Sequence, residues 1–130
     1  MKFFLLLVVV LFMVGCDSTS VSSDPENTSD SENTSWVFVA NEGSYGSSNG
    51  SISMIDDFGN IYETDVLGDV VQSLEVYGDK LIVLVNNSHK IKVYDITSEG
   101  LAMPGIEVST NGSSPREMVI VDDNVYFTNW

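Results

Sequence analysis

The amino-acid sequence predicts an all-β fold for residues 36–130, and three observations support this prediction. From residue 36 onward, short runs rich in Val, Ile, Tyr, Phe and Thr follow one another along the chain. Gly, Asn, Asp and Ser gather between these runs, as expected of turns that connect strands. No stretch in this range keeps a helical spacing of apolar residues over ten positions. Many short strands with regular turns are typical of all-β proteins.

Nine segments have the length and composition of strands, and turn compositions such as Asp57-Phe58-Gly59-Asn60 separate them. The predicted strands are 37–40, 51–56, 61–66, 73–77, 81–85, 90–96, 105–108, 117–121 and 125–128. An immunoglobulin-like sandwich also has short strands at this chain length and is the alternative all-β fold.

An internal repeat narrows the choice. Val-Phe-Val-Ala-Asn at 37–41, Ile-Val-Leu-Val-Asn at 82–86 and Val-Tyr-Phe-Thr-Asn at 125–129 look like three copies of one strand, with their asparagines 45 and 43 residues apart. A second shared segment ending in Asp follows two of these copies, at 50–56 and 89–95. A period near 43 residues with four strands per period is typical of a β-propeller blade.

These copies resemble the YVTN-type propeller repeat, in which a Tyr-Val-Thr-Asn-like strand precedes a Val-Ile-Asp-like strand. The resemblance covers residues 36–130 and implies a partial β-propeller of antiparallel four-stranded sheets, with about two blades and the start of a third. Because propellers close with roughly four to eight blades, we expect this chain to be the N-terminal part of a longer propeller.

The N-terminal segment, residues 1–15, reads as a signal peptide. Lys2 precedes an apolar run over 3–14, which at about 1.5 Å per residue would span roughly 18 Å, well short of a ~30 Å hydrocarbon core. Met13-Val14-Gly15-Cys16 resembles the lipobox of bacterial lipoproteins. That resemblance implies lipidation of Cys16, attachment to a membrane through the N-terminal lipid, and an extracytoplasmic location at the outer membrane or cell surface.

Residues 16–35 follow as an acidic linker rich in Ser and Thr, with one Val and no aromatic residue. Such a composition buries too little apolar surface to offset the ordering of the chain, so we expect disorder between the lipidated Cys16 and the folded domain. Acidic residues soon after a lipobox cysteine also resemble the surface-export signal of Bacteroidetes-type lipoproteins.

Charge and residue counts exclude several kinds of chemistry. The chain has 5 Lys and Arg against 19 Asp and Glu, a net charge of −14, which argues against nucleic acid because phosphates require clustered basic residues. His89 is the only histidine and lies in a predicted hairpin turn, so no catalytic residues, metal site or cofactor are predicted. Calcium binding by Asp56-Asp57 or Asp122-Asp123 is the alternative to a plain turn role for these acids.

The loops that follow the repeated asparagines are the predicted ligand-binding region. A propeller would gather these loops on one face, where a rigid scaffold positions binding residues. The candidates are Asn41, Glu42, Tyr45, Asn86, Asn87, Asn129 and Trp130. Tyr45 and Trp130 offer rings for stacking on a planar ligand or sugar, and the Asn side chains donate and accept hydrogen bonds. The alternative is that the asparagines satisfy turn backbone, and Arg116 either has a structural role or faces an anion.

Together these features predict a membrane-anchored extracytoplasmic lipoprotein, not an enzyme, whose propeller binds a ligand or partner. Similar Bacteroidetes-type lipoproteins imply capture of a corrinoid for an outer-membrane transporter. A structural or adhesive surface protein that binds a protein or a glycan is the alternative. A propeller enzyme is third, since the visible residues lack the His or Arg clusters it would need.

Overall fold

The computed structural model describes residues 34–130, which form ten strands in three antiparallel sheets, with no helix in this range. The predicted all-β class is therefore confirmed. The predicted signal peptide, Cys16 and nearly all of the acidic linker lie outside the described residues. In the described part of the chain no helix is long and apolar enough to cross a membrane.

Each sheet is formed by strands that are close in sequence. The first sheet has the order β1-β2-β3 and contains β1 (Val37–Asn41), β2 (Ser51–Ile55) and β3 (Ile61–Glu63). The middle sheet has the path β4-β5-β6-β7, with β8 also paired to β6, and contains β4 (Val71–Tyr77), β5 (Lys80–Val85), β6 (Lys90–Thr97), β7 (Gly100–Leu101) and β8 (Ile106–Ser109). The third sheet is the hairpin of β9 (Pro115–Val121) and β10 (Asn124–Asn129).

The nine predicted strands are all present, but some of their bounds and the number of strands differ from the prediction. The strand predicted for 61–66 ends at Glu63. Beyond it, the Ile52 N–H of β2 donates to the side-chain hydroxyl of Thr64 at 3.0 Å instead of to a backbone oxygen of the neighbouring strand. The short strand β7 was not predicted, because its two residues fall in a segment with a turn composition. The sheets also hold three, five and two strands, whereas the repeat predicts four in each complete unit.

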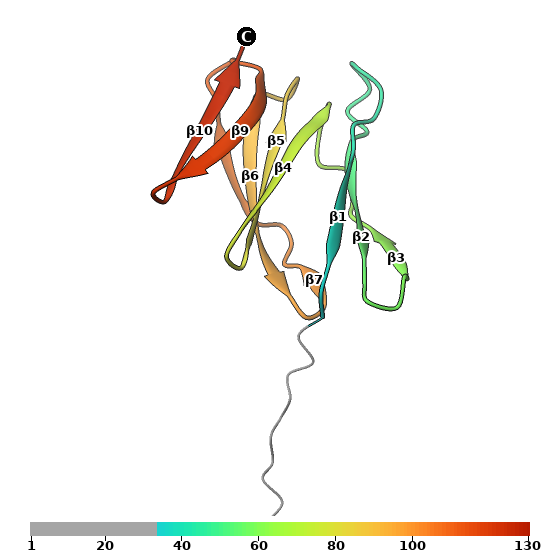
Figure 1. Cartoon of the computed structure of the whole chain (residues 1–130). Helices are drawn as coiled ribbons and strands as arrows, with labels where there is room; N and C mark the ends of the chain where they lie inside the picture. The colour runs from blue at the N-terminus through green and yellow to red at the C-terminus, as the bar shows by residue number, and fades with distance from the viewer. Residues whose placement is uncertain (1–33) are drawn as a thin grey trace, which may run out of the picture.

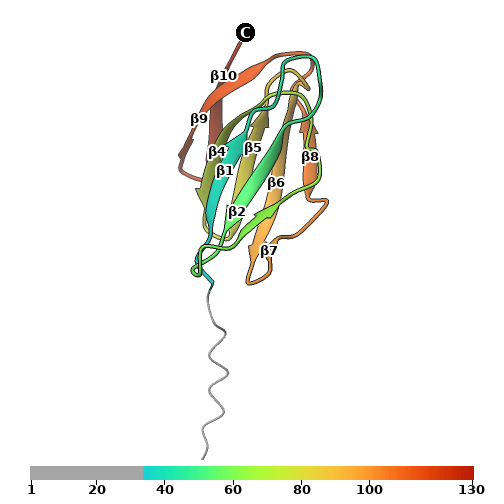
Figure 2. The same cartoon turned by 90° about the vertical axis from the view of Figure 1, so that its right-hand side faces the viewer.

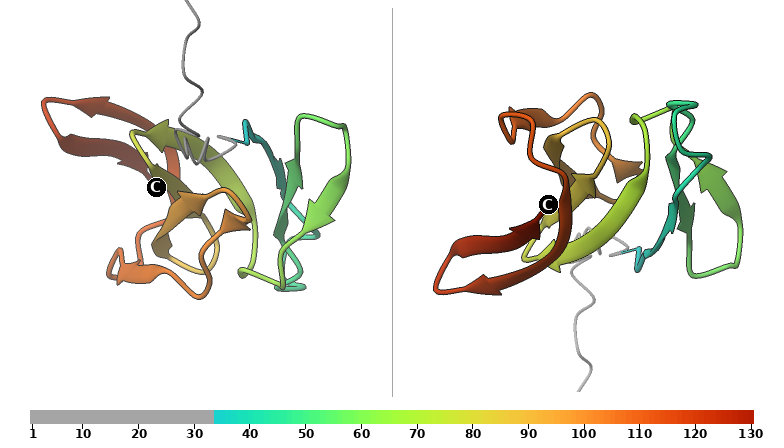
Figure 3. Two further views of the ribbon diagram at one scale, coloured as in Figure 1. Left: turned by 90° about the horizontal axis from the view of Figure 1, so that it is seen from below. Right: turned by 90° about the horizontal axis from the view of Figure 1, so that it is seen from above.

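The three sheets lie side by side, with the middle sheet between the other two (Figure 1). Seen end-on, the first and third sheets flank opposite faces of the middle sheet (Figure 3). The strands of the first and middle sheets run in roughly the same direction, so one sheet covers the other (Figure 2).

The core lies between the first and middle sheets. Ile52 from β2 is fully buried there, together with Leu81 and Val83 from β5 and Tyr94 from β6. Burial of one such aliphatic side chain stabilises the fold by about 1.5–3 kcal/mol. The two sheets approach closely at Gly50, where an added Cβ would lie 2.8 Å from Val71 Cγ2, so this position requires glycine.

The hairpins β4–β5 and β9–β10 share one register. The ladder begins with the pair Val71↔Val85 in the first hairpin and Pro115↔Asn129 in the second. Val85, rather than Asn86, is therefore equivalent to Asn129. The alignment of the three asparagines expected from the sequence is wrong by one residue at Asn86, because β5 is a continuous apolar run, which looks similar after a shift of one position and lacks the alternation that would fix its register.

Candidate functional site

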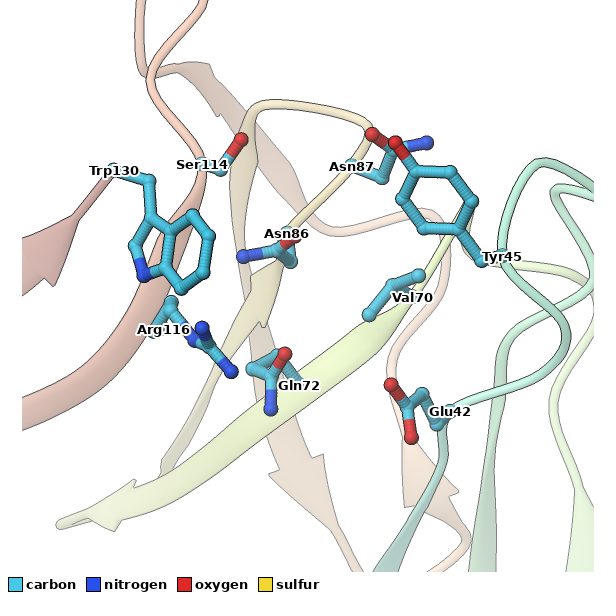
Figure 4. Close-up of a pocket in the computed structure, with 9 residues that line it drawn as sticks. All are labelled: Glu42, Tyr45, Val70, Gln72, Asn86, Asn87, Ser114, Arg116 and Trp130. Carbon is cyan, nitrogen blue, oxygen red and sulfur yellow. The ribbon is translucent and has the colours of Figure 1, made fainter.

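One end of the three sheets gathers the loop β1–β2, the turn β5–β6 and the end of β10, as expected for the loops after the repeated strands (Figure 1). A cavity of about 300 Å³ lies between them (Figure 4). It is lined by Glu42, Tyr45, Val70, Gln72, Asn86, Asn87, Ser114, Arg116 and Trp130.

Five of the seven predicted ligand-binding residues line this pocket: Glu42, Tyr45, Asn86, Asn87 and Trp130. Asn41 and Asn129 end β1 and β10 and do not line it. Asn41 is used within the first sheet, where its Nδ2 donates to Ser51 Oγ at 3.1 Å and to Ser53 Oγ at 2.8 Å. Asn129 is paired with Pro115 in the third sheet. Contact with a ligand stays a prediction for all seven.

Three pocket residues come from one repeated backbone position. Glu42, Asn86 and Trp130 are each the first residue after a strand, namely after β1, β5 and β10. The backbone repeats as well: Asn86 N–H donates to Val70 O at 2.8 Å, and Trp130 N–H donates to Ser114 O at 3.2 Å. The chain therefore presents three different side chains, an acid, an amide and an indole, from equivalent places.

Two further pairs of pocket residues repeat in the same way. Val70 and Ser114 directly precede β4 and β9. Gln72 and Arg116 lie next to the first ladder pair of each hairpin, where β4 and β9 have one residue more than their partners. Such a bulge redirects a side chain that the alternation of a regular strand would place elsewhere. Because a bulge leaves little trace in composition, the sequence did not single out Val70, Gln72 and Ser114.

The asparagines of the pocket are partly used by the protein itself. Asn86 Nδ2 donates to the backbone oxygen of Pro115 at 2.9 Å and so links the middle sheet to the third. Asn87 Nδ2 donates to Asp69 Oδ2 at 2.5 Å. These Nδ2 atoms therefore have structural partners outside their own turn, rather than the turn backbone considered in the sequence analysis, and neither bond uses the amide oxygen.

Asp69 organises the rim of the pocket and was not anticipated from the sequence. Only 5% of this residue is exposed, and its carboxylate accepts from the Gly46 N–H, next to Tyr45, at 2.9 and 3.0 Å. The same carboxylate accepts from Asn87 on the neighbouring turn. Buried charges are stable only when they are hydrogen-bonded, and here those bonds fix two loops relative to each other.

The rims of the pocket carry two exposed aromatic rings. Tyr45 is 79% exposed and Trp130 is 83% exposed, and the two lie on opposite sides of the cavity in Figure 4. The guanidinium carbon of Arg116 lies 4.6 Å from the centre of the Trp130 ring, a cation–π contact. None of the ion pairs among residues 34–130 includes Arg116, so its charge is available to a ligand.

Other predicted groups lie away from the pocket. His89 is in the β5–β6 turn, but it is half-buried rather than freely solvated, with Nδ1 3.0 Å from Ser113 O. Asp56 accepts from Phe58 N–H and from Asn60, and the hydrogen bond from the Asn60 side chain is the main cause of its lowered pKa. Within 34–130 no group of three or more His, Cys, Asp and Glu side chains is placed to hold a metal ion.

No protein-family model and no curated protein matches this chain. The resemblance to YVTN-type repeats and to lipoprotein signals therefore rests on the residues themselves. The chemistry of the pocket is the main basis for a functional proposal.

Proposed function

We propose that this chain is a membrane-anchored extracytoplasmic lipoprotein whose β-propeller binds a ligand at the end of the sheets formed by the loops. The observation that carries the proposal is the pocket itself, because its lining comes from repeated positions of the three sheets. In a propeller these positions converge on one face, where neighbouring blades together form a binding site.

Three features support the propeller part of the proposal. β4, β5, β6 and β8 form an antiparallel four-stranded path, which is the strand number of a blade. The first sheet corresponds to the last three strands of that path, and the third sheet corresponds to its first two. Three sheets in a row also differ from the two facing sheets of an immunoglobulin-like sandwich.

Exposed apolar side chains indicate where further blades would pack. Ile106 and Val108 on β8 are 66% and 51% exposed, and Val119 and Tyr126 on the third sheet are each 56% exposed. Large apolar side chains that are exposed together on a strand or a hairpin often mark an interface. Additional strands beside β10 would cover Ile106 and Val108, as the first sheet covers the other face of the middle sheet, and a further sheet packed on the third would cover Val119 and Tyr126.

The lipid anchor is tested by the variant Cys16→Ala. Acyl chains hold a protein at a bilayer by about 0.8 kcal/mol per buried methylene, so removal of the acylation site should release the protein into the soluble fraction. Fractionation of cells that express the full chain measures this. Unchanged membrane retention of Cys16→Ala would contradict the anchor and leave the pocket unaffected.

The binding role is tested by titration of the full chain while the tryptophan fluorescence is recorded, because Trp130 lines the pocket. The probes are hydroxocobalamin, which represents the corrinoids that the resemblance implies, and soluble glycans. At least one probe should change the fluorescence saturably, and Arg116→Ala should abolish the change. Glu117→Gln, which alters an exposed neighbour on β9 outside the pocket, is the control. Failure of every probe to saturate would contradict a binding role.

A further inference from the structure

The charge of the pocket differs from the charge of the chain. The whole protein has a net charge of −14, whereas the pocket contains one acid, Glu42, and one base, Arg116. The formal charge of the residues that line the cavity is therefore zero, since Asp69 lies behind this lining with its carboxylate bonded to Gly46 and Asn87. An anion such as a phosphate would be attracted by the Arg116 guanidinium but repelled by the net negative charge of the protein. A cation would be repelled by the same guanidinium at close range. Neutral ligands fit this balance best.

The polar lining matches hydroxyl groups. Gln72, Asn86 and Asn87 provide amides, and Ser114 provides a hydroxyl, all of which are able to accept or donate hydrogen bonds. An apolar ligand would remove water from these groups without replacing their hydrogen bonds, which is unfavourable for each group. A ligand with several hydroxyl groups would satisfy them, and Glu42 and Arg116 would add stronger charge-assisted bonds.

The aromatic rims suit a ring with an apolar face. Tyr45 and Trp130 are the two aromatic residues that line the pocket. Both are largely exposed, and they flank its polar lining (Figure 4). Sugars combine hydroxyl groups at their edges with C–H faces that pack on aromatic rings. The cavity volume of about 300 Å³ lies at the lower limit of ligand pockets, which suits one or two sugar rings rather than a macrocycle.

We infer that the pocket binds a neutral sugar, whose C–H face packs on Trp130 and whose hydroxyl groups bond to Gln72, Glu42 and Arg116. This inference rests on the proposed binding function and specifies its ligand class. Trp130 is its main specificity-determining residue, because this ring replaces the acid and the amide that the two equivalent positions carry, Glu42 and Asn86.

The test is saturation-transfer NMR of the full chain with the methyl glycosides of glucose, galactose, mannose and N-acetylglucosamine. We expect saturable transfer to at least one of them, strongest at the ring C–H protons. Trp130→Ala should weaken binding by about 10-fold or more, and Trp130→Phe should retain most of it because the aromatic face is kept. Trp130 is largely exposed, so neither substitution should affect folding.

The matched control is Tyr126→Ala, which removes an exposed aromatic residue of the same hairpin that lies outside this pocket and should leave sugar binding unchanged. Absence of transfer to all four glycosides, or equal transfer to wild type and Trp130→Ala, would overturn the inference. Hydroxocobalamin separates the two proposals. If it binds in a Trp130-dependent way while the sugars do not, the ligand class is wrong and the binding function stands. If neither binds, both are overturned.

Discussion

The two faces of the middle sheet differ in how completely they are covered. On the face toward the first sheet, Leu81, Val83 and Tyr94 are fully buried. On the face toward the third sheet, Leu84 near β9 is fully buried, but Ile106 on the outer strand β8 is 66% exposed. We refer to these as the closed and the open interface.

The difference comes from the neighbouring sheet rather than from the composition of the middle sheet. Both faces carry aliphatic residues, but the third sheet has two strands, which cover only the inner part of a five-stranded sheet. β8 shows this within one strand: Glu107 is paired with lysines on one face, while Ile106 and Val108 face the uncovered side. Burial, and therefore stability, is expected to reside mainly in the closed interface.

The largest expected effect compares isoleucine in the two interfaces. Ile52→Ala should lower the free energy of unfolding by about 2–5 kcal/mol, because Ile52 is fully buried and truncation leaves a cavity. Ile106→Ala should change it by less than about 0.5 kcal/mol, because the side chain is already largely in water. Urea unfolding of the full chain measures both values. Equal losses would show that the open interface is covered in solution.

A smaller effect is expected from the polar link across the open interface. Asn86→Ala removes the hydrogen bond from Asn86 Nδ2 to the backbone oxygen of Pro115. Pro115 is buried, so the loss of this donor should lower the free energy of unfolding by about 1 kcal/mol. Asn60→Ala removes the hydrogen bond from Asn60 Nδ2 to Asp56 in an exposed turn and should cost only a few tenths of a kcal/mol. If Asn86→Ala were as mild as Asn60→Ala, the link would not hold the third sheet in place.

The same contrast explains what the sequence could predict. Strands such as β5 and β10 were found because short runs of β-branched, aliphatic and aromatic residues between turn compositions indicate strands, whichever sheet covers them. How much of each face is covered depends on strands distant in sequence, so the exposure of Ile106 was not predictable from its neighbours. The strand β7 was missed for the opposite reason, because two residues carry no periodicity.

For the pocket, the loops were predictable and the bulges were not. Glu42, Tyr45, Asn86, Asn87 and Trp130 follow recognisable strands, so counting along the repeat placed them on one end of the sheets. Gln72 reaches the pocket only through one extra residue in β4, a feature of backbone register. Asp69 was not singled out either, because its burial depends on two loops that meet in space.

The closed interface contains a buried phenol, that of Tyr94. Its hydroxyl is buried without a hydrogen-bond partner among the described residues. Tyr94→Phe should therefore be neutral or stabilise the fold by up to about 1 kcal/mol at pH 7, since it removes an unsatisfied polar atom and keeps the ring. Thermal unfolding measures this, with Tyr126→Phe at an exposed position as the control. A clear loss of stability in Tyr94→Phe would show that the hydroxyl has a partner in solution.

The same variant predicts a change in alkaline stability. Burial, with a smaller contribution from Glu107, raises the pKa of Tyr94 to about 12, above the value of about 10 in an unfolded chain. The folded protein thus holds the phenol proton more tightly than the unfolded chain does. The resulting contribution to the free energy of unfolding is complete below pH ~10 and is lost as the pH rises toward ~12. The decline over this range should be smaller in Tyr94→Phe than in wild type. Parallel curves would contradict the burial of the phenol.

The smallest expected effect concerns the charged face of β8. Glu107 Oε1 lies 2.6 Å from Lys90 Nζ and Oε2 lies 3.3 Å from Lys92 Nζ, and the hydrogen bond from Lys90 is the main cause of the lowered pKa of Glu107. Because these side chains are partly in water, Glu107→Gln should cost less than about 1 kcal/mol at pH 7. A carboxyl whose pKa is lowered by folding stabilises the protein above its unfolded pKa of about 4.3, and this contribution is lost as the pH falls through the lower folded value.

The difference between wild type and Glu107→Gln should therefore vanish in acid and shrink in high salt, whereas the cost of Ile52→Ala should persist in both. Glu117→Gln, on an exposed acid outside the ion pairs, should show no difference at any pH. Urea unfolding at several pH values and salt concentrations measures these responses. If Glu107→Gln proved as costly as Ile52→Ala, the ion pairs of β8 would rank with the closed interface, and apolar coverage would no longer explain where the stability of this fold resides.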